Sequence, residues 1–189
     1  QMPDLGTFFK GKGIPKSQVI PKGIPCIRYG ELYTKHHQII RGISSYIAAE
    51  NTKNAFSIEY GDVLIAGSGE TIEEIGKSAV YLGREQAFCG SDILVFRPFV
   101  KGAYWGYMLN SRLVREQLNQ RGTGAQVAHI YISDLEKIRV PHHNEDECDA
   151  IATTLERTSQ AILSTKELIE CSRSTLKGLV NNIFNSGDV

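Results

Sequence analysis

Short apolar runs bounded by Gly, Pro or Ser recur along roughly the first 140 residues. The runs are five to seven residues long and rich in β-branched and aromatic side chains, as strands are. Because they are short and joined by long polar connections, they predict an α+β fold with an irregular, twisted, mostly antiparallel sheet and a few helices. The predicted strands are residues 24–29 (IPCIRY), 61–66 (GDVLIA), 77–82 (KSAVYL), 92–98 (DILVFRP) and 129–133 (HIYIS).

A helical period replaces this pattern between residues 103 and 118. Apolar side chains recur there every three to five positions, which predicts one amphipathic helix. Further along, we expect Asp134 to cap a turn at residues 134–138 and Pro141 to close the folded body. The apolar positions of the helix are Tyr104, Met108, Leu109, Leu113, Val114 and Leu118.

After Pro141 the pattern becomes one long helical repeat. From residue 145 to about residue 184 there is no proline, and the acidic residues 145–147 suit the positive end of a helix dipole. Apolar residues recur every seven positions, which indicates a coiled-coil seam on a helix of about 40 residues, ~60 Å long. The seam consists of Leu155, Ile162, Ile169, Leu176 and Ile183, with companion positions Ile151, Thr158, Thr165, Ser172 and Leu179.

The companion positions are apolar only at the two ends of the seam, so small side chains in its middle permit close approach of a partner. A rod of this length cannot bury its stripe against a body of about 140 residues without projecting past it, and we expect a second helix to pair with it. Folding of the helix back onto its own domain is the alternative. We therefore expect a domain at residues 1–143 and a dimerisation or spacer helix at residues 144–189. The predicted pairing interface is Ile151, Leu155, Ile162, Ile169, Leu176, Leu179 and Ile183.

Composition places the chain among ordinary globular proteins, with 41% hydrophobic and 22% charged residues. No apolar run approaches the roughly 18–20 residues that span a bilayer, so no membrane partner is expected. The four cysteines are scattered without C-x-x-C spacing, which favours reduced thiols in a cytosolic protein. The histidine pairs at 36–37 and 142–143 have no Cys or carboxylate at ligand spacing, so no metal site is predicted.

The formal net charge of zero hides an asymmetry between the two parts. Residues 1–143 carry 17 Lys/Arg and 13 Asp/Glu, a balance of +4, whereas residues 144–189 carry 4 and 8, a balance of −4. A basic body with an acidic appendage suggests that the body is the part that meets a polyanion.

A glycine-rich stretch, GSGETIEEIGKS at residues 67–78, follows a predicted strand as a nucleotide-binding loop would. Six residues, and not four, separate Gly69 from Gly76-Lys77-Ser78, and three of them are glutamates. This spacing favours a surface loop between two strands. A phosphate-handling enzyme that uses the loop remains an alternative.

Several motifs together resemble a known family. KGIPCIRYGELY (22–33), GDVLIAGSGETIEEIGKSAVY (61–81) and GTGAQVAHIYISDLEKIRVPHHNEDECDAIA (122–152) occur in this order and are followed by the heptad helix. Over essentially the whole chain they resemble the specificity (S) subunits of type I restriction–modification systems. The resemblance implies one target-recognition domain and one of the two long helices of such a subunit, either as a half-subunit that dimerises or as a fragment.

What the resemblance implies is a non-catalytic, cytoplasmic subunit that reads half of a bipartite site in double-stranded DNA. It would position modification (methyltransferase) subunits, with restriction subunits joining the full complex. This chain would bind no cofactor, and the partner subunits would use S-adenosylmethionine and ATP with Mg²⁺. Its helix would act as a ruler by packing antiparallel against a second copy or a second half. A coiled-coil assembly protein that does not read DNA is the alternative.

Candidate DNA contacts divide into phosphate and base contacts. Lysines among glycines suit phosphates because the chain can approach the backbone closely, and Arg and Gln suit the edges of guanine and adenine. The predicted phosphate contacts are Lys10, Lys12, Lys16, Arg28, Lys35, Lys77 and Arg84, and the predicted base contacts are Arg121, Thr123, Gln126 and His129.

Overall fold

The structure is a computed structural model that describes residues 1–69, 75–121, 128–141 and 143–185. The chain forms two compact units, Gln1–Asp149 and Ala150–Val189. All strands among the described residues belong to the first unit. Each unit is therefore described by itself.

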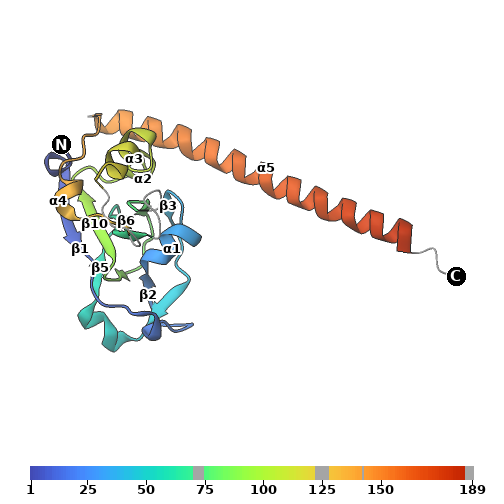
Figure 1. Cartoon of the computed structure of the whole chain (residues 1–189), viewed down its shortest axis with the longest axis horizontal. Helices are drawn as coiled ribbons and strands as arrows, with labels where there is room; N and C mark the ends of the chain where they lie inside the picture. The colour runs from blue at the N-terminus through green and yellow to red at the C-terminus, as the bar shows by residue number, and fades with distance from the viewer. Residues whose placement is uncertain (70–74, 122–127, 142, 186–189) are drawn as a thin grey trace. The chain divides into compact units, whose positions relative to one another are not determined.

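A five-stranded sheet forms the centre of the first unit (Figure 1). Its neighbouring strands pair antiparallel except β3 and β8, which run parallel. The central strand β6 is buried along its whole length, as a run of four apolar residues requires. In spatial order the strands are β1 (Gly6–Lys10), β10 (Ile93–Pro98), β6 (Val63–Ala66), β8 (Ser78–Tyr81) and β3 (Ile39–Ile40).

A second sheet of four strands contains one parallel pair, β2 with β9. A third, of two strands, pairs β7 (Ser68–Gly69) with β11 (Ala128–His129). Most pairings are antiparallel, so the α+β fold predicted from the sequence is confirmed. The pattern missed β1, which has five residues, and several strands of two or three residues that depend on tertiary pairing. The four-stranded sheet consists of β4 (Ser45–Ile47), β2 (Ile24–Ile27), β9 (Ala87–Cys89) and β5 (Phe56–Ile58).

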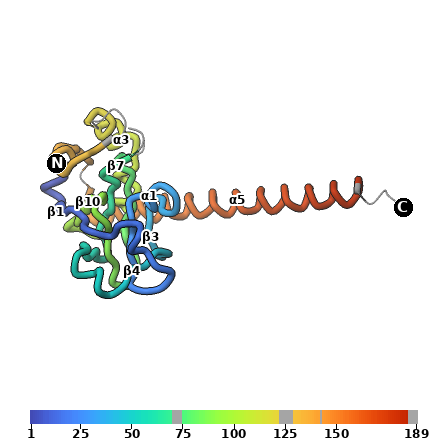
Figure 2. The backbone as a smooth tube through the Cα atoms, turned by 60° about the horizontal axis from the view of Figure 1, so that its bottom comes forward, coloured from blue at the N-terminus to red at the C-terminus, as the bar shows by residue number. Residues whose placement is uncertain are grey.

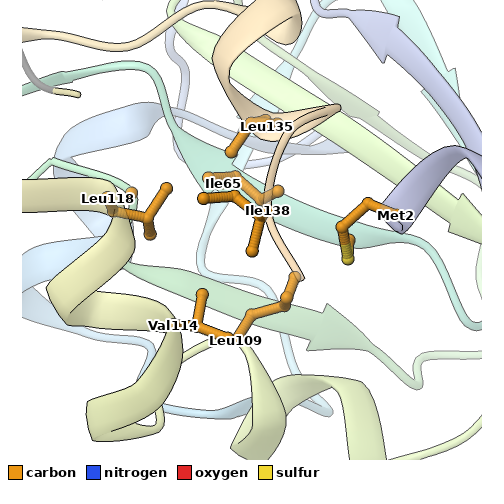
Figure 3. Close-up of a pocket in the computed structure, with 8 residues that line it drawn as sticks. Met2, Ile65, Leu109, Val114, Leu118, Leu135 and Ile138 are labelled. Atoms are coloured by element: carbon orange, nitrogen blue, oxygen red, sulfur yellow. The ribbon is translucent and has the colours of Figure 1, made fainter. Parts of the chain in front are cut away.

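The two faces of the five-stranded sheet bury alternate residues of each strand. On β6, Leu64 and Ala66 belong to a core that includes Ile27 and Cys89 of the four-stranded sheet. Ile65 points to the opposite face, where helices and the chain's first residues cover it. Figure 3 shows this second apolar cluster, in which Met2, Ile65, Leu109, Val114, Leu118, Leu135 and Ile138 converge.

The prediction of a single helix at residues 103–118 is wrong. Two helices form instead, α2 (Tyr104–Met108) and α3 (Arg112–Asn119). The break follows from Asn110, whose side-chain amide donates to the carbonyls of Ser78 (2.6 Å) and Gly106 (2.7 Å). A polar side chain that ties the chain to strand β8 interrupts the helical period.

Two predicted strands also end earlier than expected, because helices begin inside them. β2 ends at Ile27 before α1 (Tyr29–Thr34), and β11 ends at His129 before α4 (Ile132–Leu135). In both cases a carboxylate in the first turn accepts a hydrogen bond from the backbone N–H just before the helix. Asp134 does so from Tyr131 at 3.1 Å. The prediction that Asp134 caps a turn at residues 134–138 is wrong, because the helix begins two residues earlier and Asp134 lies inside its first turn. Three short 3₁₀ turns complete the unit: η1 (Met2–Asp4), η2 (Lys16–Gln18) and η3 (Ala49–Asn54).

A buried ion pair holds the turn that leads into β6. Asp62 is fully buried, and both of its carboxylate oxygens accept hydrogen bonds from Arg97 of β10, at 2.7 and 2.8 Å. One of these oxygens also accepts the N–H of Glu59 at 2.8 Å. The acceptor positions of Asp62 are thus well used, which a carboxylate this deeply buried needs.

The long helix α5 spans Glu145–Asn185, close to the predicted bounds. It begins with a reciprocal cap: Asn144 Oδ1 accepts the N–H of Glu147 at 2.9 Å, and Glu147 Oε2 accepts the N–H of Asn144 at 3.0 Å. The predicted seam is solvent-exposed from Leu155 onward, and Ile183 is 68% exposed. No helix in the described ranges combines the length and apolar character needed to cross a membrane.

The polar middle of the seam is less polar than its sequence indicates. The hydroxyls of Thr158 and Thr165 donate to the carbonyls four residues earlier, at 2.9 and 2.8 Å. The hydroxyl proton of each threonine is thereby used within the helix. A partner helix consequently meets no unpaired hydroxyl donor at these two companion positions.

Candidate nucleic-acid interface

Four strand ends converge at one end of the five-stranded sheet. β1 ends at Lys10, which lies opposite Leu94, while β6 ends at Ala66, which lies opposite Ile93. Lys77 directly precedes β8, and its carbonyl accepts the N–H of Ala66 at 2.9 Å. The register therefore brings Lys10 and Lys77, two predicted phosphate contacts, to the same end of the sheet.

The two-stranded sheet brings two distant segments to this end as well. Ser68 lies opposite His129, and Gly69 lies opposite Ala128. The first residues of the glycine-rich stretch thus meet the predicted base contact His129, although Ser68 and His129 are 61 positions apart in the sequence. Figure 2 follows the backbone through this region, where β1, β10 and β7 are labelled. The predicted base contacts Thr123 and Gln126 lie outside the described residues.

A groove of about 510 Å³ opens at this end of the sheet. It combines a lysine, two aromatic rings and several small polar groups, a mixture suited to phosphates and to base edges. Tyr131 is 57% exposed and its ring stacks beside that of His129. The lining residues are Lys10, Gly67, Ser68, Ser91, Asp92, Leu94, His129, Ile130, Tyr131, Ile132 and Ser133.

Backbone hydrogen bonds hold the walls of the groove in place. The N–H of Gly67 donates to the carbonyl of Asp92 at 2.9 Å, and the N–H of Ile130 donates to the carbonyl of Gly67 at 3.0 Å. The N–H of Ser91, another lining residue, donates to the carbonyl of Gly13 at 3.1 Å. These bonds join four separate chain segments, so groove side chains extend from a fixed frame.

Side-chain contacts add to this frame. Ser68 Oγ lies 3.1 Å from His129 Nδ1, which orients the imidazole. The Tyr33 hydroxyl donates to the carbonyl of Ser68, and Lys77 Nζ donates to the carbonyl of Tyr33 at 3.2 Å. Lys77 therefore holds Tyr33, which in turn bonds to the lining residue Ser68, and Lys77 itself does not line the groove.

Of the three predicted phosphate contacts Lys10, Lys12 and Lys16, only Lys10 lines the groove. Lys12 follows two residues after the end of β1, with its side chain exposed and its N–H donating to Cys89 at 3.4 Å. Lys16 lies in η2 and is also exposed. These two side chains present positive charge outside the groove.

Lys35 is engaged within the protein. Its Nζ donates to Glu31 Oε1 at 2.9 Å and to Ser44 Oγ at 2.8 Å. Burial raises the pKa of Glu31, but hydrogen bonds from Lys35, Ser45 and the Arg28 N–H outweigh it and lower that pKa overall. A DNA phosphate would therefore compete with Glu31 for the Lys35 ammonium.

The three predicted arginines lie in different places. Arg28 precedes α1 and is half-buried, whereas Arg84 is exposed beyond the end of β8 opposite to Lys77. Arg121 follows α3, leads into the undescribed residues 122–127, and its guanidinium donates to the carbonyl of Gln117 at 3.4 Å. None of the three lines the groove among the described residues.

Sequence reasoning missed Asp92, Tyr131 and Ser133 as groove residues. It sought positive charge for phosphates, and so passed over the carboxylate of Asp92. It also assigned residues 129–133 to one strand, which hid the turn that exposes Tyr131. The signal available in the sequence was an aromatic residue, Tyr131, shortly before Asp134, the residue predicted to cap a turn.

No cysteine is among the described residues that line the groove. In the part of the chain that the structure describes, no three His, Cys, Asp or Glu side chains gather to hold a metal ion. The four cysteines are free thiols, and burial raises the pKa of Cys26 to about 11.

Comparison with solved structures identifies the fold. The S subunit of the type I restriction–modification system from M. genitalium matches 99% of the chain at 19% identity, with a TM-score of 0.59. The HsdS subunit from Thermoanaerobacter tengcongensis matches 100% at 18% identity, with a TM-score of 0.64. A chain from a structural study of complex assembly and conformational transition in a type I R-M system matches 100% at 18% identity, with a TM-score of 0.72.

The chain thus has the fold of the type I restriction–modification S subunits, and the resemblance seen in its motifs is confirmed at the level of the fold. It spans less than half of each solved chain, 45%, 45% and 44% respectively. No family model matches the sequence, and no curated protein matches it.

Proposed function

We propose that this chain is a DNA-specificity subunit of a type I restriction–modification complex. The likeness of the whole chain to S subunits, at a TM-score of up to 0.72, is the observation that carries the proposal. The groove at Lys10 and His129 supports it, because it lies where the predicted DNA-reading segments meet.

In this proposal the body reads one half of a bipartite site in double-stranded DNA. Lys10 neutralises a phosphate, with Lys12 beside it, while His129 and the residues of the groove approach base edges. The chain catalyses nothing itself. Modification subunits bring S-adenosylmethionine chemistry to the bound site, and restriction subunits add ATP and Mg²⁺.

The helix α5 sets the distance between two half-sites. Its exposed seam pairs antiparallel with a second copy, which supplies the second reading body. Two-fold symmetry in the protein then imposes inverted repeats on the DNA. Insertion of seven residues into α5 should change the spacer between the half-sites and preserve the half-sites themselves. An unchanged spacer would contradict the ruler.

The DNA-binding part is tested by measuring affinity for duplex DNA as a function of salt. The wild-type chain should bind more weakly as salt rises, with log K falling linearly with log salt. Lys10→Gln should reduce that slope by about 1, since one phosphate contact is lost. Lys53→Gln is the matched control, because Lys53 is an exposed lysine on η3 that does not line the groove.

The same measurement separates the proposal from a coiled-coil assembly protein that does not read DNA. Such a protein would form oligomers through its helix and show no salt-dependent DNA affinity. Equal slopes for Lys10→Gln and Lys53→Gln would remove the groove from the DNA interface, even if the chain binds DNA elsewhere.

A further inference from the structure

One carboxylate occupies the groove that otherwise suits a phosphate backbone. Asp92 is exposed and lines the groove together with Lys10 and His129. Among the described residues, its side chain makes no hydrogen bond and no ion pair. An unpaired carboxylate on a DNA-binding surface repels phosphates, so Asp92 would have to contact some other group on the DNA.

The fold uses the backbone of this residue and not its side chain. The carbonyl of Asp92 accepts the N–H of Gly67 at 2.9 Å, and the next residue, Ile93, donates to Gly90 at 3.3 Å. Asp62 differs in that its carboxylate is buried and accepts three hydrogen bonds. The turn therefore holds the backbone of Asp92 in place, and its carboxylate is available to a ligand.

Hydrogen-bond chemistry limits what this carboxylate can meet on DNA. An ionised carboxylate only accepts hydrogen bonds, and the donors on major-groove base edges are the amino groups of cytosine N4 and adenine N6. Adenine places an acceptor, N7, beside its amino group, where a carboxylate would be repelled. Cytosine offers its amino donor without that neighbour, and Asp and Glu suit it for this reason.

We propose that Asp92 is a specificity-determining residue that accepts a hydrogen bond from the N4 amino group of a cytosine in the half-site. This inference rests on the proposed DNA-reading function. Lys10, in the same groove, holds the adjacent backbone and offsets the repulsion between Asp92 and the phosphates. Ser91 and Ser133 supply hydroxyls that adapt to neighbouring base edges.

The test is selection of duplexes from a randomised pool by the full chain, followed by sequencing. Wild type, Asp92→Asn and Asp92→Ala are compared with Glu50→Gln, which removes an exposed carboxylate on η3. The wild-type half-site should contain one strongly preferred C·G pair. Asp92→Ala should lower the preference at that pair by roughly tenfold to a hundredfold and leave the other positions intact.

Asp92→Asn sharpens the test, because an amide both donates and accepts. It should shift the preferred base at the same position from cytosine toward adenine, whose N6 and N7 match an amide. Glu50→Gln should reproduce the wild-type motif. Equal thermal unfolding midpoints for all four proteins show that the variants fold.

The outcomes separate the inference from the function on which it rests. An unchanged motif in both Asp92 variants overturns the role of Asp92 and leaves DNA reading intact. Loss of preference at every position would assign Asp92 to the general architecture of the groove and overturn the base-specific role. A wild-type chain that enriches no motif contradicts the proposed function, and the role of Asp92 with it.

Discussion

The folded body and the long helix treat their apolar side chains in opposite ways. In the body, Ile65 and Tyr81 are almost fully buried, and the carboxylate inside the core, Asp62, is paired with Arg97. Along the helix, Ile162 and Ile169 are about half exposed, and the polar seam residues bond to their own backbone. The body buries its apolar side chains, whereas the helix leaves its apolar seam exposed.

This difference separates the two kinds of partner in the proposed function. A helix in water gains most of its stability by packing an apolar stripe, and the proposed pairing with a second helix would cover this exposed stripe. The body leaves polar and charged groups unused instead, in the groove at Lys10 and Asp92. Its unused chemistry suits DNA, and that of the helix suits another helix.

The largest effect is expected for the ion pair inside the body. Asp62→Ala leaves Arg97 without its buried partner and should lower the free energy of unfolding by about 3–5 kcal/mol. Glu59→Gln is the control, because Glu59 also pairs with Arg97 at 2.8 Å but is half-exposed, and should cost at most about 1 kcal/mol. Urea unfolding followed by tryptophan fluorescence, which reports on Trp105, measures both. Equal costs would mean that the body does not depend on this pair.

A charge in the helix seam should separate association from folding. Ile169→Asp places a carboxylate in the pairing interface of each copy and should weaken self-association by about 100-fold or more. Leu163→Asp is the matched control, since Leu163 and Ile169 are both 45% exposed but Leu163 lies off the seam. Sedimentation equilibrium gives the dissociation constants. If the two variants associate equally, the seam is not the interface.

A smaller effect is expected at the junction of the two regions. Asn144→Ala removes the reciprocal cap with Glu147 and should destabilise the first turn of α5 by about 1 kcal/mol. Asn144→Asp should restore most of it, because aspartate caps equally well. Amide hydrogen exchange at residues 145–148 measures the fraying. Unchanged exchange in Asn144→Ala would show that packing alone holds the helix start.

The finest test concerns pH and is confined to the body. His36 is buried and its Nε2 has no hydrogen-bond partner among the described residues. Burial lowers its pKa from the ordinary 6.5, with Glu31 opposing the shift and Lys35 and His37 adding to it. The unfolded chain then binds the proton more tightly. Stability is full above about pH 6.5 and declines as pH falls toward the folded-state pKa.

His36→Gln should flatten this decline, while His37→Gln, at the exposed neighbouring position, should keep it. Urea midpoints measured between pH 5 and pH 8 report the slopes, a range chosen around the ordinary histidine pKa of about 6.5. Glu31, whose pKa is lowered, still weakens the fold at more acidic pH in both variants. Identical slopes in wild type and His36→Gln would contradict a buried neutral imidazole.

The sequence predicted the features that depend on local signals and missed those that depend on contacts between distant segments. The bounds of α5 were predicted closely because a seven-residue repeat and an acidic first turn are local signals. The pairing of β7 with β11 was not predicted, because strands of two residues carry no period and form only where the tertiary fold brings them together. The break at Asn110 had a local signal, a polar residue followed by serine, but its cause is a distant strand.

The candidate site shows the same division. Lys10 was predicted from its residue type and neighbouring glycines, and His129 as a base contact in its segment, and both line the groove. Asp92 could not be found in that way, because its place beside Lys10 results from the β1–β10 register. Lys35 could not be set apart from the other lysines, since its engagement with Glu31 and Ser44 is visible only in the folded chain.

The central claim is that the body reads DNA and the helix pairs two such bodies. It is tested most directly by co-expressing the chain with its cognate modification subunit and mapping methylated bases across the host genome. The account predicts one methylated motif made of two inverted half-sites at a fixed spacing. Assembly of the complex without any methylated motif would contradict DNA reading, and a motif with two unlike halves would contradict pairing of identical copies.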